Sequence, residues 1–138
     1  MKEIIKEIIK DGKVVARHIL ESDIKEGLNF YSNDDEFIQV GAWNYDNGKK
    51  LLGHIHNEVD RVVNRTCEVL YVIKGRLEAR IDDLSENLLD TFVVGQGEIL
   101  VLLECGHGYT ILSDDTKVIE IKNGPYLGAD VDRRRIEN

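Results

Sequence analysis

Three of the four histidines in this chain lie in or beside short patterns that suggest metal chemistry. The first pattern is Gly53-His54-Ile55-His56. On a strand, His54 and His56 point to the same face and stand about 7 Å apart, so that one ion can bridge their imidazoles. Taken alone, such a pair is also typical of exposed or hydrogen-bonded structural histidines.

The second pattern is Glu68, a carboxylate at the start of an otherwise apolar stretch. Alternation along a strand puts Glu68 on the same face as Leu70 and Val72, which we expect to be buried. A carboxylate among buried apolar side chains is costly unless a cation pairs with it. A metal ion would serve, and an ion pair with Arg61 or Arg65 is the alternative.

The third pattern is His107, which lies between Gly106 and Gly108 just after an apolar run ending at Leu103. The glycines lower the steric barriers of the backbone, so a loop here can aim the imidazole at a site. A single histidine in a loop is more often simply exposed.

In their order along the chain, the three patterns resemble the two motifs of the cupin family. The resemblance covers about residues 36–122. It implies a double-stranded antiparallel β-barrel, or jelly roll, formed by one domain over 1–138. Carried over by position, it implies that a metal is held by His54, His56, Glu68 and His107. Imidazole and carboxylate ligands suit a divalent transition metal, namely Fe, Mn, Ni, Co or Zn.

The chain departs from the family pattern in both motifs. Eleven residues separate His56 from Glu68, far more than the usual gap. The proline of the second motif is absent: Leu103 stands near its place, and the only proline is Pro125. Glu58 shares strand parity with the two histidines before it and therefore competes with Glu68 as the carboxylate ligand. The apolar strand ending in glycine that follows Glu68 favours Glu68.

The resemblance implies a function in small-molecule metabolism. A metal ion that acts as a Lewis acid suits the isomerisation or epimerisation of a small sugar-like or oxygenated metabolite. The long loop before Glu68 and the Gly124-Pro125-Tyr126 tail resemble a cupin subgroup associated with surface-sugar biosynthesis. An iron-dependent dioxygenase and a non-catalytic binding or sensing protein are the alternatives.

Few residues are candidates for the remaining roles in catalysis and binding. Tyr109 and Glu104 flank His107 and are the catalytic candidates, although a packed ring and an exposed loop charge are the alternatives. Arg65 and Tyr45 are the candidates for binding substrate, with Arg65 suited to an anionic group. His18 has no partner in the sequence, and we expect it to be structural.

The elements that must position these residues are strands. Short runs rich in Val, Ile and Leu recur between Gly, Asn and Asp turns at intervals of about 8–12 residues, which favours an all-β fold. An N-terminal β-hairpin turning at Asp11-Gly12 is favoured over a helix, because branched residues flank the pair. The runs predicted as strands are 14–20, 37–45, 50–56, 67–73, 77–81, 91–94, 98–103, 109–112 and 118–121.

Composition sets the class of protein. With 138 residues, 42% of them hydrophobic and 32% charged, the chain has the profile of one globular domain. A net charge of −8 argues against binding to nucleic acid. The sequence shows neither a membrane-spanning run nor a secretory leader, so we expect a cytoplasmic protein with its cysteines reduced.

The face of the Glu68 strand opposite the predicted site carries Val69, Tyr71 and Ile73. A barrel strand with one wet side should carry polar residues there. We therefore expect a second subunit to cover this face, giving a homodimer in which N-terminal strands pack across the interface or are exchanged.

Overall fold

The structure is a computed structural model that describes residues 5–136. Ten strands, one short helix and one 3-10 turn form within this range. They are β1 (Lys6–Lys10), β2 (Lys13–Ile19), η1 (Glu21–Asp23), β3 (Gly27–Phe30), β4 (Gly41–Asn44), β5 (Glu68–Lys74), β6 (Arg76–Asp82), β7 (Leu88–Gly95), β8 (Ile99–Leu102), β9 (Gly106–Ile111), β10 (Lys117–Lys122) and α1 (Ala129–Asp132).

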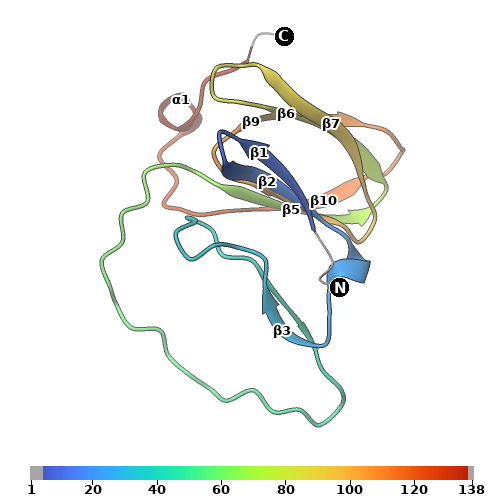
Figure 1. The fold of residues 1–138 in the computed structure, drawn as a ribbon, viewed down its shortest axis with the longest axis vertical. Coiled ribbons are helices and arrows are strands. Elements are labelled where there is room, and N and C mark those ends of the chain that lie inside the picture. Colours follow the sequence, from blue (N-terminus) through green and yellow to red (C-terminus); the bar gives the residue numbers. More distant parts are fainter. Residues whose placement is uncertain (1–4, 137–138) are drawn as a thin grey trace.

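Two antiparallel sheets make up the body of the molecule (Figure 1). The larger has five strands in the order β1-β2-β8-β5-β10, and the smaller has three in the order β7-β6-β9. A separate two-stranded sheet pairs β3 with β4. The prediction of an all-β fold is confirmed. Over residues 5–136 the two sheets of the body stay open at their edges rather than joining into one closed barrel.

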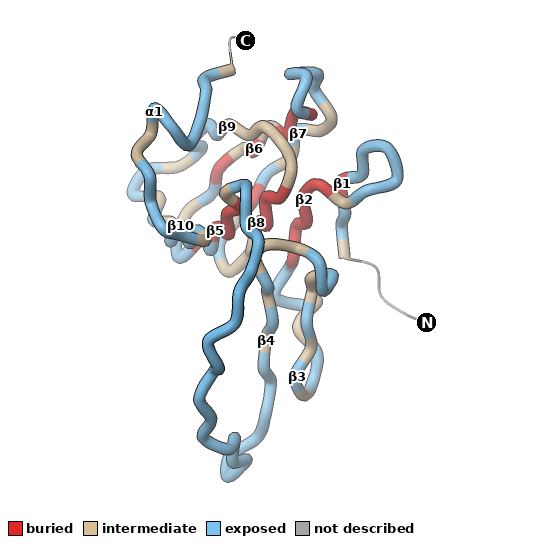
Figure 2. Tube along the Cα trace, turned by 90° about the vertical axis from the view of Figure 1, so that its left-hand side faces the viewer, coloured by how far each residue is buried: buried red, intermediate tan, exposed pale blue. Residues whose placement is uncertain are grey.

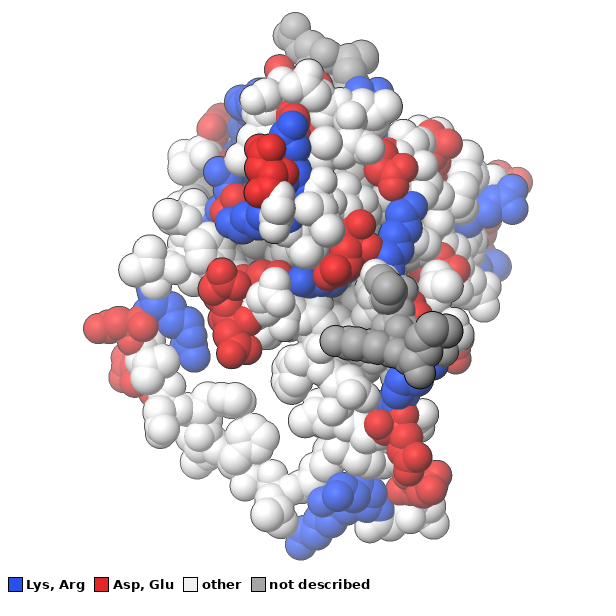
Figure 3. Space-filling model, viewed as in Figure 1, with Lys and Arg blue, Asp and Glu red and all other residues white. Residues whose placement is uncertain are grey.

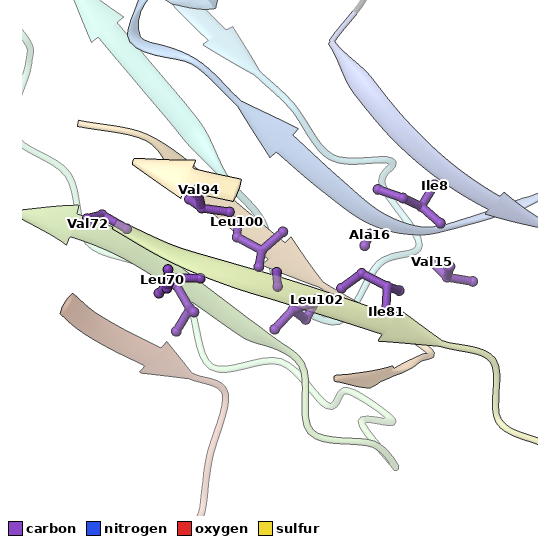
Figure 4. Close-up of a cluster of buried hydrophobic side chains, with 11 residues drawn as sticks. Ile8, Val15, Ala16, Leu70, Val72, Ile81, Val94, Leu100 and Leu102 are labelled. Atoms are coloured by element: carbon purple, nitrogen blue, oxygen red, sulfur yellow. The ribbon is translucent and has the colours of Figure 1, made fainter. Parts of the chain in front are cut away.

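The core lies between the five-stranded and the three-stranded sheets (Figure 4). Alternate residues of each strand point inward, and most are branched or small apolar side chains. Complete burial of each large apolar side chain contributes about 1.5–3 kcal/mol to the free energy of folding. The five-stranded sheet contributes Ala16, Leu70, Val72, Leu100 and Leu102, and the three-stranded sheet contributes Leu77, Ala79, Ile81 and Val94.

The outer face of the five-stranded sheet is only partly covered. Val69 and Val101 are buried there beneath segment 31–40, which forms a second apolar cluster with them. Farther along β5, Tyr71 and Ile73 are exposed. The chain itself therefore covers one part of the face for which we expected a second subunit, and leaves the other part open.

The N-terminal hairpin is confirmed. Strands β1 and β2 pair around Asp11 and Gly12, whose φ angles of 52° and 75° fit the tight turn that joins two strands with their natural twist. Strand β2 then pairs with β8 of the same chain. This pairing places the hairpin in the five-stranded sheet of its own chain.

A long segment between β4 and β5, residues 45–66, leaves the body and returns to it; we call it the arm (Figures 1 and 2). Residues 45–65 are all exposed, and the arm contains no strand. The prediction of a strand over 50–56 is therefore wrong. The alternating pattern there indicates only a local preference for extended structure. A strand also needs a neighbouring strand with which to form hydrogen bonds, and this stretch has none.

Two further predictions need correction. The strand predicted over 37–45 is reduced to Gly41–Asn44, and its partner β3 has only four residues, too few for a clear sequence pattern. His107 lies on β9, not in a loop, because the strand begins at Gly106, before the apolar run that marks it in the sequence. No helix among residues 5–136 is long and apolar enough to cross a membrane.

Candidate functional site

Glu68 and His107 join the two sheets at one end of the core. Glu68 is the first residue of β5 and points inward with Leu70, as alternation predicts, while His107 on β9 lies opposite the buried Ile81. The Nε2 atom of His107 is 2.6 Å from the Oε2 atom of Glu68. Two residues that are 39 positions apart in the chain therefore form one pair, in which Glu68 is buried and His107 half-buried.

The electrostatics of the pair keep the Glu68 carboxyl ionised. Burial raises the pKa of Glu68, but the hydrogen bonds from His107 and from the carboxyl of Glu120 lower it by more, to about 2. An anionic carboxylate facing an imidazole holds the ring in one orientation. It is also ready to receive a cation.

Two more polar side chains surround this pair. The ring of Tyr109 lies 5.6 Å from the ring of His107, centroid to centroid. Burial and the nearby carboxylates of Glu68 and Glu120 raise the pKa of Tyr109, so its phenol stays protonated. The hydrogen bond with Glu68, together with burial, raises the pKa of Glu120. The site therefore offers a carboxylate, an imidazole, a protonated phenol and a second carboxyl group.

The second ring nitrogen of His107 is unusual. Nδ1 is buried and has no hydrogen-bond partner among residues 5–136. A buried polar atom without a partner costs about 1–3 kcal/mol, so native structures keep few of them. This atom is consequently poised to bind something that the chain alone does not supply.

The arm carries the other two predicted ligands. His54 and His56 lie with their ring centroids 4.9 Å apart, edge to face, on an exposed stretch of the arm. The two rings lie close together although the strand on which the prediction depended does not form. The structure does not bring them to Glu68 and His107, because the arm extends away from the body (Figure 2).

Other candidates fall in different places. Glu58 is exposed on the arm, whereas Glu68 is buried in the body beside His107. Glu104 forms an ion pair with Lys13, at 3.0 Å between Nζ and Oε1, and lines a cavity of 210 Å³ under segment 31–40. That cavity belongs to the second apolar cluster rather than to the Glu68–His107 pair.

The two substrate-binding candidates both lie on the arm. Arg65 is exposed near its end, where the backbone oxygen of Arg65 accepts a hydrogen bond from Asn123 Nδ2 at 3.2 Å. Tyr45 lies at its start, with the ammonium of Lys49 5.2 Å from the centre of its ring. In this conformation neither residue reaches the Glu68–His107 pair.

His18 and the cysteines have structural roles. His18 is buried, its Nε2 atom is 2.8 Å from Glu98 Oε1, and its ring stacks on Phe92. Both thiols are free. Burial raises the pKa of Cys67, and it raises that of Cys105 to about 12. Protonated, desolvated thiols are poor nucleophiles and poor metal ligands.

The four predicted metal ligands do not meet within one described chain. No group of three or more His, Cys, Asp or Glu side chains suited to a metal occurs among residues 5–136. The body supplies a carboxylate and an imidazole with a free nitrogen, and the arm supplies two imidazoles. The donors suit a transition metal by type, but they are divided between two parts of the molecule.

Sequence reasoning missed Glu120, which faces inward on β10 opposite Leu70. Its signal was the same as that of Glu68: a carboxylate inside an apolar run, here between Ile119 and Ile121. Read in this way, the sequence predicts a second inward carboxyl on the neighbouring strand.

Comparison with known proteins returned no relative: no family model matches the chain, and neither a curated protein nor a solved structure matches it. The cupin resemblance therefore depends on the motif residues of the sequence alone.

Proposed function

We propose that this protein is a cupin-like, metal-binding isomerase or epimerase that acts on a small sugar-like or oxygenated metabolite. The observation that carries the proposal is the Glu68–His107 pair, in which a carboxylate oxygen and an imidazole nitrogen, two donors suited to one metal ion, face each other at 2.6 Å. Glu68 and His107 would hold a divalent transition metal together with His54 and His56. In the cupin-like arrangement the two open sheets would close into a jelly-roll barrel around the ion.

A bound ion would supply Lewis acidity toward a carbonyl or hydroxyl oxygen of the substrate. The chain's own residues would carry out proton transfer. Tyr109 holds its proton beside His107 and is suited to donate it to a substrate oxygen. Arg65 on the arm is suited to bind an anionic substrate group such as a phosphate.

Metal analysis with a matched pair of carboxyl variants tests the proposal. Purified wild-type protein should contain a transition metal, and Glu68→Gln should lose most of it. Glu58→Gln is the control, because Glu58 is the competing carboxylate on the exposed arm. Equal loss from both variants, or no metal in the wild type after reconstitution with Fe, Mn, Co, Ni and Zn salts, contradicts the metal site.

A second experiment tests the reaction class. In D₂O, an isomerase or epimerase exchanges the hydrogen on the carbon next to the substrate carbonyl, and NMR detects the exchange in a mixture of hexoses and hexose phosphates. Tyr109→Phe should abolish exchange. Tyr71→Phe, on the outer face of β5, should retain it. Binding of a sugar without exchange would favour the non-catalytic alternative.

The geometry of the pair also favours a second candidate, which is proton transfer without a metal. A carboxylate 2.6 Å from one imidazole nitrogen orients the ring and leaves the other nitrogen free to act as a base. Deuterium exchange that persists in protein stripped of metal by a chelator would select this mechanism. Loss of exchange on stripping, with recovery on adding metal, would exclude it.

A further inference from the structure

The arm is an unusual segment for a chain of this size. Residues 45–65 are exposed throughout, and Figure 3 shows open space between the arm and the body. Several of its residues are large and apolar, with Leu52 77% and Ile55 91% exposed. The others are Leu51, Val59, Val62 and Val63. Apolar side chains gathered on one exposed segment mark a surface that binds a partner.

Strand β9, which carries His107, has one edge without a neighbouring strand. Among residues 5–136, β9 pairs only with β6. Leu112 N donates to Arg76 O at 3.0 Å, and bonded and non-bonded positions alternate along an antiparallel pair. The backbone groups of His107, Tyr109 and Ile111 therefore point to the free edge. Such an edge is a template for one more strand.

The side chains of β9 and those of the arm can face the same side of the sheet if the arm pairs with the free edge. His107 and Tyr109 lie opposite the buried Ile81 and Ala79, so their side chains point into the core. On an added strand, His54 and His56 share one face with Leu52. If that face points inward, the two imidazoles lie beside His107. The side chain of Leu52 then becomes buried as well.

The arm is anchored to its own body at its C-terminal end. Cys67 N donates to Asn123 Oδ1 at 2.7 Å, and the hydroxyl of Thr66 donates to Asp132. At the other end, segment 31–40, which leads through β4 into the arm, is held on the body by the bonds from Arg17 to Glu36. Between these attachments the arm projects outward, where a second copy of the chain can receive it.

Charge also suits a second copy. The arm has four basic residues (Lys49, Lys50, Arg61 and Arg65) and three acidic ones, in a chain with a formal net charge of −8. The body is therefore the acidic part, and an arm that docks on another body meets complementary charge. Exchange of identical segments closes symmetrically on two chains.

We propose that two copies of this chain exchange arms, each arm adding a strand to β9 of the other copy and placing His54 and His56 beside that copy's Glu68 and His107. The inference rests on the proposed metal site and assigns its ligands to two chains. It also explains why the body of each chain holds only two of the four ligands.

Mixed dimers test the exchange. One chain carries His54→Ala and His56→Ala, the other carries His107→Ala, and two affinity tags select the mixed pair after co-expression. Neither variant alone should retain metal. The mixed pair should recover about half of the wild-type metal per chain, because one of its two shared sites is intact. Sites within single chains would leave the mixed pair without metal.

A readout that does not depend on metal accompanies this test. Wild-type protein should be a dimer by light scattering, and Leu52→Asp should convert it to a monomer, since an exposed residue of the free arm becomes buried on docking. Val131→Asp, which is 73% exposed in the C-terminal segment, is the matched control and should remain dimeric. A wild-type monomer, or a Leu52→Asp dimer, overturns the exchange.

The two proposals fail separately. Wild-type protein that binds metal while the mixed pair does not refutes the exchange and leaves the metal site standing. A wild-type dimer that Leu52→Asp dissociates but that holds no metal refutes the metal site, and leaves the arm as the dimer contact.

Discussion

Replacing Arg17 by alanine should strongly destabilise the protein, because it leaves a carboxylate buried without its partner. The guanidinium of Arg17 holds Glu36 with two bonds, Nη1–Oε1 at 2.6 Å and Nη2–Oε2 at 2.9 Å. The two side chains are only 5% and 8% exposed. The pair fastens segment 31–40, which leads into β4 and the arm, onto the outer face of the five-stranded sheet.

The size of the effect follows from burial. Removing one partner of a buried ion pair costs about 3–5 kcal/mol, because the remaining charge has no compensation. Replacing both partners by apolar residues, as in Arg17→Met with Glu36→Leu, should cost much less. Arg17 also binds Glu7, at 2.9 Å from Nε to Oε2, but Glu7 is exposed, so Glu7→Ala should cost about 0–1 kcal/mol.

Urea unfolding followed by circular dichroism measures these differences, at one protein concentration so that association does not shift the result. The expected order of destabilisation is Arg17→Ala first, then the Met/Leu double variant, then Glu7→Ala. An Arg17→Ala cost no larger than that of Glu7→Ala would refute the reasoning that this pair is buried and structural.

Three further predictions concern single positions. Gly75→Ala should lower the free energy of unfolding, measured in urea, more than Gly12→Ala does. Both glycines have a positive φ, but a Cβ at Gly75 would lie 2.5 Å from Thr116 Oγ1, while a Cβ at Gly12 would meet open space. The pKa of Glu68, ordinarily 4.5, is about 2 in the fold, so its stabilisation is complete above pH 4.5 and is lost as the pH falls toward 2. Metal-free Glu68→Gln should lack this part of the acid sensitivity, and an unchanged pH profile would count against the pair. Cys105, with its pKa raised to about 12, should react with a thiol reagent at pH 8 only after unfolding, whereas rapid labelling of the native protein would contradict its burial.

Alternation along strands could be read from the sequence wherever a strand forms. It placed Glu68 inward with Leu70 and Val72, because side chains on a strand must point to opposite faces in turn. The hairpin at Asp11-Gly12 was predictable for a similarly local reason, since few residue pairs accept the backbone angles of that turn. These features depend on neighbouring residues only.

Features that depend on distant partners could not be predicted in this way. The stretch 50–56 has the composition of a strand, yet nothing in the sequence says whether another strand lies beside it. The same limit applies to Arg17 and Glu36, which are 19 residues apart. Of the four predicted metal ligands, the structure brings together Glu68 and His107, whose strands pack in one body. It leaves His54 and His56 on the arm.

Anomalous diffraction from crystals of metal-loaded protein, recorded at the absorption edge of the bound metal, tests the central claim most directly. We predict one peak for each chain, in contact with Glu68 and His107 of one copy and with His54 and His56 of the other. A loaded crystal with no peak at the Glu68–His107 pair, or with a peak at the two arm histidines alone, would contradict the claim.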